Sequence, residues 1–379
     1  MGELVIRNAA LVLADEVVRG SVRVVDGRID AVDSGGTAVP GAVDLEGDYL
    51  VPGLVELHTD NFERHLMPRP KVKWPEMPAL LAHDAEVVAA GITTVYDALG
   101  IGDADEDALR GGDMRGIARV LESAAADRLL RAEHFLHIRC ELPAPNTLEL
   151  FAPFEGNPRV GLISLMDHTP GQRQWTDIHQ ARVYYCGKKG WSEERFQVEL
   201  SEAPRLQALY AAPHRRHFIE YARSRGIPLA SHDDTLPEHV AEAHADGVSI
   251  SEFPTSAAAA AEARARGMSV VMGAPNMVRG GSHSGNVATA ELARRDLLDT
   301  LSSDYVPASL MLAAFMLTDD AGFDLPRAIA TVSGNPARSV GLADRGEIAP
   351  GKRADLVRVR DTAHVPAVMT VWRGGERVG

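Results

Sequence analysis

The chain has 379 residues, of which 45% are hydrophobic and 24% are charged, and its formal net charge is −14. This is the composition of a globular protein that is long enough for one large domain and a smaller one. The acidic charge argues against nonspecific binding of nucleic acid. No apolar run reaches the ~18 residues of a membrane span, and no basic and apolar leader opens the chain. With only two cysteines, Cys140 and Cys186, we expect a cytoplasmic protein without a disulfide framework.

Both ends of the chain are rich in short strand patterns. Residues 3 to about 50 contain alternating apolar segments, and Asp26-Gly27 is a hairpin turn between two of them. Residues 355–359 and 367–372 have the same character. Because each piece is too small to fold alone, we predict one small β-sandwich domain made of residues 1–50 together with 344–379.

Between these ends, strand-like and helix-like segments alternate over residues 51–343. We count eight strand-like segments, at 51–57, 92–96, 135–140, 160–166, 227–231, 248–252, 269–272 and 298–302. This α/β alternation predicts a (β/α)₈ TIM-like barrel. A doubly wound open sheet is the alternative, but no G-x-G-x-x-G opens a helix after a strand. Residues 167–202 are polar and interrupt the rhythm, as an active-site loop would.

Histidines and carboxylates follow several of the predicted strands. In a barrel the catalytic groups come from the carboxyl ends of the strands. Imidazole and carboxylate ligands suit zinc, iron, manganese or nickel. We therefore expect one or two divalent ions, with zinc as the first choice. The candidate ligands are His58, Asp60, Glu141, His168, His232 and Asp304.

Asp304 is also the candidate catalytic residue. A carboxylate beside a metal-activated water can take its proton as a general base. The alternative is a structural role, because Ser303-Asp304 precedes a predicted helix at 306–317 and could cap it.

A second group of residues suits phosphate. Arg279 opens a loop of small and hydroxyl residues, 279–286, whose backbone N–H groups could hold an anion. A flexible linker is the alternative reading of this loop. The candidate phosphate-binding residues are Arg279, Ser282, His283, Lys188 and Arg64.

The motifs together resemble the amidohydrolase superfamily. Pro52-Gly-Leu-Val-Glu-Leu-His58 opens the barrel, and Ile348-Ala-Pro-Gly-Lys-Arg-Ala-Asp-Leu356 closes it. The chain departs from the superfamily pattern by having His58-x-Asp60 where His-x-His is usual. It also lacks a lysine at the end of a middle strand, so Glu141 is expected to take the bridging role of a carboxylated lysine. Our count places His168 and His232 after strands four and five, where the superfamily has them after five and six.

Three further motifs are similar to those of the triphosphate diphosphatases of bacterial phosphonate catabolism. They are His58–His65, Asp167–Gln174, and Gly273–Asn276 with the loop 279–286 and Ser302–Tyr305. The resemblance implies hydrolysis of α-D-ribose 1-methylphosphonate 5-triphosphate to the 5-phosphate and diphosphate. The expected partner is thus a small phosphorylated sugar, and a homo-oligomer stays open. Two alternatives remain: hydrolysis or deamination of a cyclic amide, and a noncatalytic binding protein that kept the barrel.

Overall fold

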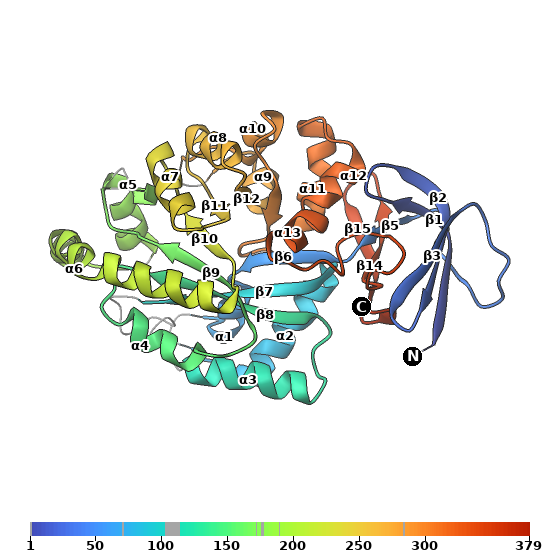
Figure 1. Ribbon diagram of the computed structural model, residues 1–379, viewed down its shortest axis with the longest axis horizontal. Helices are drawn as coiled ribbons and strands as arrows, with labels where there is room; N and C mark the ends of the chain where they lie inside the picture. The colour runs from blue at the N-terminus through green and yellow to red at the C-terminus, as the bar shows by residue number, and fades with distance from the viewer. Residues whose placement is uncertain are drawn as a thin grey trace.

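The computed structural model describes residues 2–69, 72–102, 114–171, 173–175, 178–188, 190–282 and 285–379. In Figure 1 a barrel of strands is surrounded by helices, and a smaller sheet that carries both chain termini lies at one end. The predicted fold class is therefore confirmed.

The barrel sheet has eight strands, and every pairing along it is parallel. Its strands are β6 (Leu54–Thr59), β7 (Ile92–Ile101), β8 (Glu133–Glu141), β9 (Val160–Met166), β10 (Leu229–His232), β11 (Ile250–Glu252), β12 (Ser269–Gly273) and β13 (Thr300–Ser302). They are paired in chain order, and a bridge from Thr59 to Asp304 brings the last strand back to the first. All eight predicted strands are present, so His168 and His232 do follow the fourth and fifth.

Helices cover the outside of the barrel, as Figure 1 shows. They are α1 (Asn61–Leu66), α2 (Glu76–Ala89), α3 (Met114–Ala126), α4 (Thr147–Phe151), α5 (Ile178–Arg182), α6 (Glu193–Arg225), α7 (Pro237–Ala245), α8 (Ala257–Ala265), α9 (Ala274–Val278), α10 (Thr289–Arg294), α11 (Ser309–Asp320), α12 (Leu325–Ala330) and α13 (Gly334–Ser339). Among the described residues, no helix has the length and apolar character that a membrane span requires.

Both ends of the chain contribute to the small domain, as predicted, and their strands form one mixed sheet. Its strands are β1 (Glu3–Val12), β2 (Val17–Val25), β3 (Arg28–Ser34), β4 (Val43–Asp44), β5 (Tyr49–Pro52), β14 (Leu356–Asp361), β15 (Pro366–Arg373) and β16 (Glu376–Arg377). Strand β5 pairs with β1 on one side and with β14 on the other, which joins the two termini. The domain limits at residues 50 and 343 stay a prediction.

One predicted strand is divided in two. The segment 51–57 is split between β5 and β6 at Gly53, so that the chain leaves one sheet and enters the other. A Cβ atom at Gly53 would lie 2.3 Å from the Thr93 hydroxyl and 2.8 Å from the Asp355 Cβ. Only glycine fits this close approach, which packs the small sheet against the barrel.

The predicted active-site loop at 167–202 contains short helices and a small aromatic core. It includes η3 (Arg173–Trp175), α5, the π-helical turn η4 (Val183–Lys188) and the start of α6. Tyr185 stacks on Trp191, with ring centroids 4.6 Å apart, and Trp175 lies 5.0 Å from Tyr184. This cluster stands over the carboxyl end of the barrel, where Tyr184 and Tyr185 reach the central cavity.

A buried chain of polar side chains ties α2 to the barrel. His134 donates from Nδ1 to Asp97 (2.8 Å) and from Nε2 to Asp84 (3.3 Å). Asp97 also accepts from His83 Nε2 (2.6 Å), and His83 Nδ1 accepts from Asn61 (3.0 Å). Burial lowers the pKa of His134, but the two carboxylates raise it more, to about 9. The His134 imidazolium between two carboxylates thus anchors α2 to the barrel. The same network holds Asn61, which follows Asp60 in the chain.

The His134 network makes stability depend on pH. Because the folded pKa of His134, about 9, lies above its ordinary value, its stabilisation is complete below pH ~6.5 and is lost as pH rises through that folded pKa. We expect the free energy of unfolding to fall by roughly 1–3 kcal/mol over this window relative to a His134→Gln variant. Urea unfolding of both proteins at a series of pH values measures the difference, and parallel pH curves would contradict the assignment.

Candidate active site at the carboxyl end of the barrel

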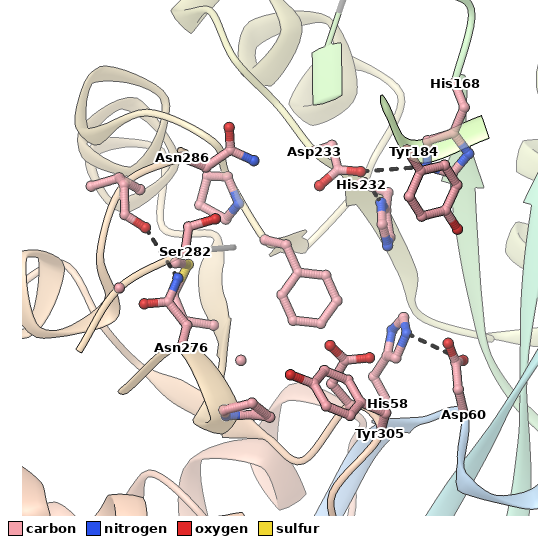
Figure 2. Close-up of a pocket in the computed structure, with 18 of the residues that line it drawn as sticks. His58, Asp60, His168, Tyr184, His232, Asp233, Asn276, Ser282, Asn286 and Tyr305 are labelled. Carbon is pink, nitrogen blue, oxygen red and sulfur yellow. Dashed lines mark hydrogen bonds and ion pairs between the residues drawn. The ribbon is translucent and has the colours of Figure 1, made fainter. Parts of the chain in front are cut away.

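A cavity of about 300 Å³ opens at the carboxyl ends of the barrel strands. Figure 2 shows imidazoles and carboxylates on one side of this cavity and amide and hydroxyl side chains on the other. Five of the six predicted metal ligands line it: His58, Asp60, His168, His232 and Asp304. Glu141, the sixth, lies directly behind His168. The sequence therefore brought together residues from five different strand ends.

His58 is held in one orientation from behind. Its Nδ1 donates to the buried Glu252 carboxylate (2.9 Å), which also accepts from the Ser164 hydroxyl (2.6 Å). Burial lowers the pKa of His58, but Glu252 raises it more, so the pKa lies above its ordinary value. With Nδ1 committed to Glu252, the lone pair of His58 Nε2 is left for the cavity side, 3.8 Å from Asp60. This carboxylate–imidazole arrangement is the one that orients metal-binding histidines.

Asp304 is fixed by the seam where the barrel closes. Its backbone N–H donates to the His58 carbonyl (3.1 Å), and its carbonyl accepts from the Asp60 N–H (2.9 Å). Helix α11 begins at Ser309 with Ala308 as its cap, so Asp304 is not the helix cap. No hydrogen bond from the described residues reaches its carboxylate, and burial and then the Asp60 charge raise its pKa. The side chain is thus free for chemistry in the cavity.

His168 and His232 form the second imidazole group, and Asp233 lies between them. The Asp233 carboxylate accepts from His232 Nδ1 (2.8 Å) and lies 3.4 Å from His168 Nε2. Glu141 accepts from His168 at both the backbone N–H (2.8 Å) and Nδ1 (2.5 Å). Burial lowers the pKa of His168, but Glu141 and Asp233 raise it to about 10.

These residues fit a divalent metal. The buried Nε2 of His232 has no hydrogen-bond partner, and an unpaired polar atom in that position costs free energy unless a ligand uses it. One atom each from His58, Asp60 and Asp304 lies within 4.8 Å of the others, and the same is true of His168, His232 and Asp233. Two adjoining ligand groups therefore face one cavity.

Arg139 is a buried cation in this acidic wall. It extends from β8 into the cavity, and its Nη1 donates to Asp60 Oδ1 (2.8 Å). Burial lowers the pKa of the guanidinium, but the carboxylates of Asp60, Glu63, Glu252 and Asp304 raise it above its ordinary value. The guanidinium is permanently charged, so Asp60 faces a fixed positive partner.

The opposite wall carries part of the predicted phosphate set. Ser282, Asn276 and Asn286 lie there in Figure 2, and Arg279 and Tyr305 also line the cavity. Arg64 is not among the lining residues, because its guanidinium donates to Glu86 on α2. His283 and the side chain of Lys188 lie outside the described residues.

Three residues of the site have left-handed backbones. Asp233 (φ 56°), Phe253 (φ 51°) and Asp304 (φ 54°) each follow the end of a barrel strand. A non-glycine residue in this region costs roughly 1–3 kcal/mol. Phe253 packs edge-on against His58 and His232, with ring centroids 4.9 Å and 5.4 Å apart. These strained turns therefore position the candidate ligand residues Asp233 and Asp304, and the Phe253 ring that packs against the two histidines.

Our sequence reasoning missed Arg139, Asp233 and Glu252 as site residues. The signal for Arg139 was present, because His137, Arg139 and Glu141 alternate with the apolar Leu136, Ile138 and Cys140 in a buried strand. In such a strand the polar face points to one side, here into the barrel. Asp233 and Glu252 were visible only as polar residues at strand ends.

Known proteins are similar to the chain over its whole length. The α-D-ribose 1-methylphosphonate 5-triphosphate diphosphatase of Escherichia coli (strain K12) is 48% identical over 99% of the chain and 100% of that enzyme. The model of the Amidohydrolase family matches residues 205–378. The chain belongs to the amidohydrolase superfamily. An adenine deaminase of Desulfatibacillum aliphaticivorans is 25% identical over 99% of the chain and 58% of that protein. The predicted family is therefore confirmed.

Solved structures show the same fold. N-acetyl-D-glucosamine-6-phosphate deacetylase from Mycobacterium smegmatis matches 99% of this chain and 100% of its own, with a TM-score of 0.65 and 18% identity. Molinate hydrolase matches 99% of this chain and 94% of its own, with a TM-score of 0.67 and 14% identity. At these identities the likeness concerns the barrel and its small β domain.

The Glu252 contact to His58 predicts an effect on metal affinity. Glu252→Gln keeps the size of the side chain but removes the charge that orients His58, and loss of such a partner typically costs 10- to 100-fold in affinity. We expect a weakening of about this size when zinc is titrated against a chelator of known affinity. Glu262→Gln, on the outer helix α8, is the control and should leave affinity unchanged. Equal affinities for all three proteins would contradict the role of Glu252.

Proposed function

We propose that the protein hydrolyses α-D-ribose 1-methylphosphonate 5-triphosphate to α-D-ribose 1-methylphosphonate 5-phosphate and diphosphate. The single observation that carries this proposal is the full-length, 48% identical diphosphatase relative. The cavity supports it, because a wall of imidazoles and carboxylates faces a wall with Arg279 and Ser282. A triphosphate needs both a reaction centre and donors for its phosphoryl oxygens.

The reaction centre would hold one or two divalent ions. His58, Asp60, Glu141, His168, His232 and Asp304 are the proposed ligands. When bound, such an ion lowers the pKa of a coordinated water toward neutrality and stabilises charge on phosphoryl oxygens. Zinc is our first choice, and iron, manganese and nickel suit the same ligands.

Asp304 would act as the general base. Its carboxylate is free of hydrogen bonds from the described residues, and its raised pKa brings it closer to neutral pH, where a base works best. It would take the proton of the attacking water while the bond between the α- and β-phosphates breaks. The diphosphate then leaves, and the ribose keeps one phosphate.

Arg279 and Ser282 would hold the phosphate chain on the opposite wall. Guanidinium and hydroxyl donors match phosphoryl oxygens in geometry and charge. They would place the α-phosphate against the imidazole wall. His283 is proposed for the same role, with Lys188 as a weaker candidate. Arg64 is no longer proposed, because its guanidinium donates to Glu86.

Phosphorus NMR of the triphosphate substrate tests the proposal. Incubation with purified, metal-replete protein should give diphosphate, while the methylphosphonate signal is retained. Release of orthophosphate alone would indicate a different cleavage. An unchanged spectrum, from protein shown to hold metal, would overturn the assignment and favour cyclic-amide hydrolysis or deamination.

Asp304→Asn should lower kcat far more than it changes KM. Removal of a general base typically costs 10²- to 10⁴-fold in rate, and a group that acts only in the transition state affects kcat rather than binding. Steady-state kinetics measures the split, with Asp296→Asn on the surface as the control. If Asp304→Asn kept most of its kcat, Asp304 would be a ligand or a structural residue only.

Arg279→Ala should weaken substrate binding. Loss of a charged contact to phosphate costs about 1.5–3 kcal/mol, which is roughly 10- to 100-fold in kcat/KM. The effect should shrink at high salt if it is electrostatic. Arg295→Ala, on the outer face near α10, is the matched control. Unchanged kcat/KM in Arg279→Ala would remove this residue from the phosphate site.

A further inference from the structure

Arg139 has no assigned role, although it is placed at the centre of the site. Only 7% of the residue is exposed, and that exposed part lies in the cavity. Its Nη1 donates to Asp60, and its Nε is buried without a partner. A buried guanidinium is costly unless carboxylates surround it. Here Asp60, Glu63, Glu252 and Asp304 supply that surrounding charge.

Two of the carboxylates that compensate Arg139 are also candidate metal ligands. Asp60 and Asp304 form one candidate ligand group with His58, and His168, His232 and Asp233 form the other. Two metal ions in such a site lie about 3.5–4 Å apart. A fixed positive charge in hydrogen-bond contact with Asp60 opposes a second divalent ion beside Asp60, and the guanidinium occupies the Oδ1 atom of Asp60.

We infer that Arg139 takes the place of a second metal ion and limits the site to one divalent ion per chain. This inference rests on the proposed metal-dependent function. Among the described residues, three carboxylates line the cavity, those of Asp60, Asp233 and Asp304, and they then face one divalent ion and one guanidinium. The departure from His-x-His at His58-x-Asp60 fits the same arrangement, because the Asp60 carboxylate forms an ion pair with the guanidinium and a neutral imidazole would not.

The number of metal ions bound per chain tests the inference independently of catalytic activity. The full-length protein is loaded with zinc or with manganese, freed of excess metal, and analysed by mass spectrometry of the metal. We expect one ion per chain in the wild type and in Arg139→Lys, which keeps the charge. In Arg139→Met, which has similar length and no charge, we expect the count to rise to two.

The control is an arginine that is equally buried and distant from the cavity. Arg345 is 7% exposed and donates to Glu133 and Thr94 at the other end of the barrel. Arg345→Met should keep one ion per chain. If Arg139→Met does not give folded protein, Arg139→Gln carries the same expectation, because it keeps a donor for Asp60 and lacks the charge.

Each outcome decides between distinct conclusions. Two ions in the wild type, or one ion in folded Arg139→Met, would overturn the role of Arg139. One ion in Arg139→Met together with weaker substrate binding would make Arg139 a phosphate ligand in place of a substitute for metal. No metal in the wild type would instead overturn the metal site of the proposed function itself.

Discussion

The structure depends on the seam where the last barrel strand returns to the first. Glu56 accepts hydrogen bonds from the backbone of His58 and Ser303 (2.6 Å each), and burial raises its pKa to about 7. Asp304 completes the seam through its own backbone bonds to His58 and Asp60. The bonds that close the barrel are thus the bonds that position three of the candidate ligands. A barrel that failed to close here would lose its site at the same time.

Burial gives the site its electrostatic character. His58, Glu252, Asp233 and Arg139 are almost fully buried, so their charges are weakly screened and each needs a partner of opposite sign. Glu252 holds His58, Asp233 holds His232, and Arg139 holds Asp60. The Nε2 atoms of His58 and His232 are left for the cavity side, together with the Asp304 carboxylate. The surrounding pairs therefore select which atoms can bind a ligand, and Arg279 adds a positive charge to the cavity lining.

Much of this architecture could be predicted from local sequence patterns. Apolar runs that end in His or Asp mark strand ends, and parallel strands bring those ends to one face. The partners behind the ligands could not be predicted in this way, because Glu252 and His58 are 194 residues apart and their contact depends on strand order. Arg139 was missed for a different reason, because only the terminal residue of its strand, Glu141, was considered as a site residue. Arg64 was wrongly included in the phosphate site, because the sequence does not show that its helix turns the side chain toward Glu86.

The central claim is that one divalent ion binds at the seam, against the free Nε2 atoms of His58 and His232. Crystals grown with manganese and measured at the manganese absorption edge would test it most directly. We expect one anomalous peak in the cavity, within ~2.3 Å of both Nε2 atoms or of the Asp304 carboxylate. A peak only at the buried His83–Asp97–His134 cluster, or none in the cavity at full metal loading, would contradict it.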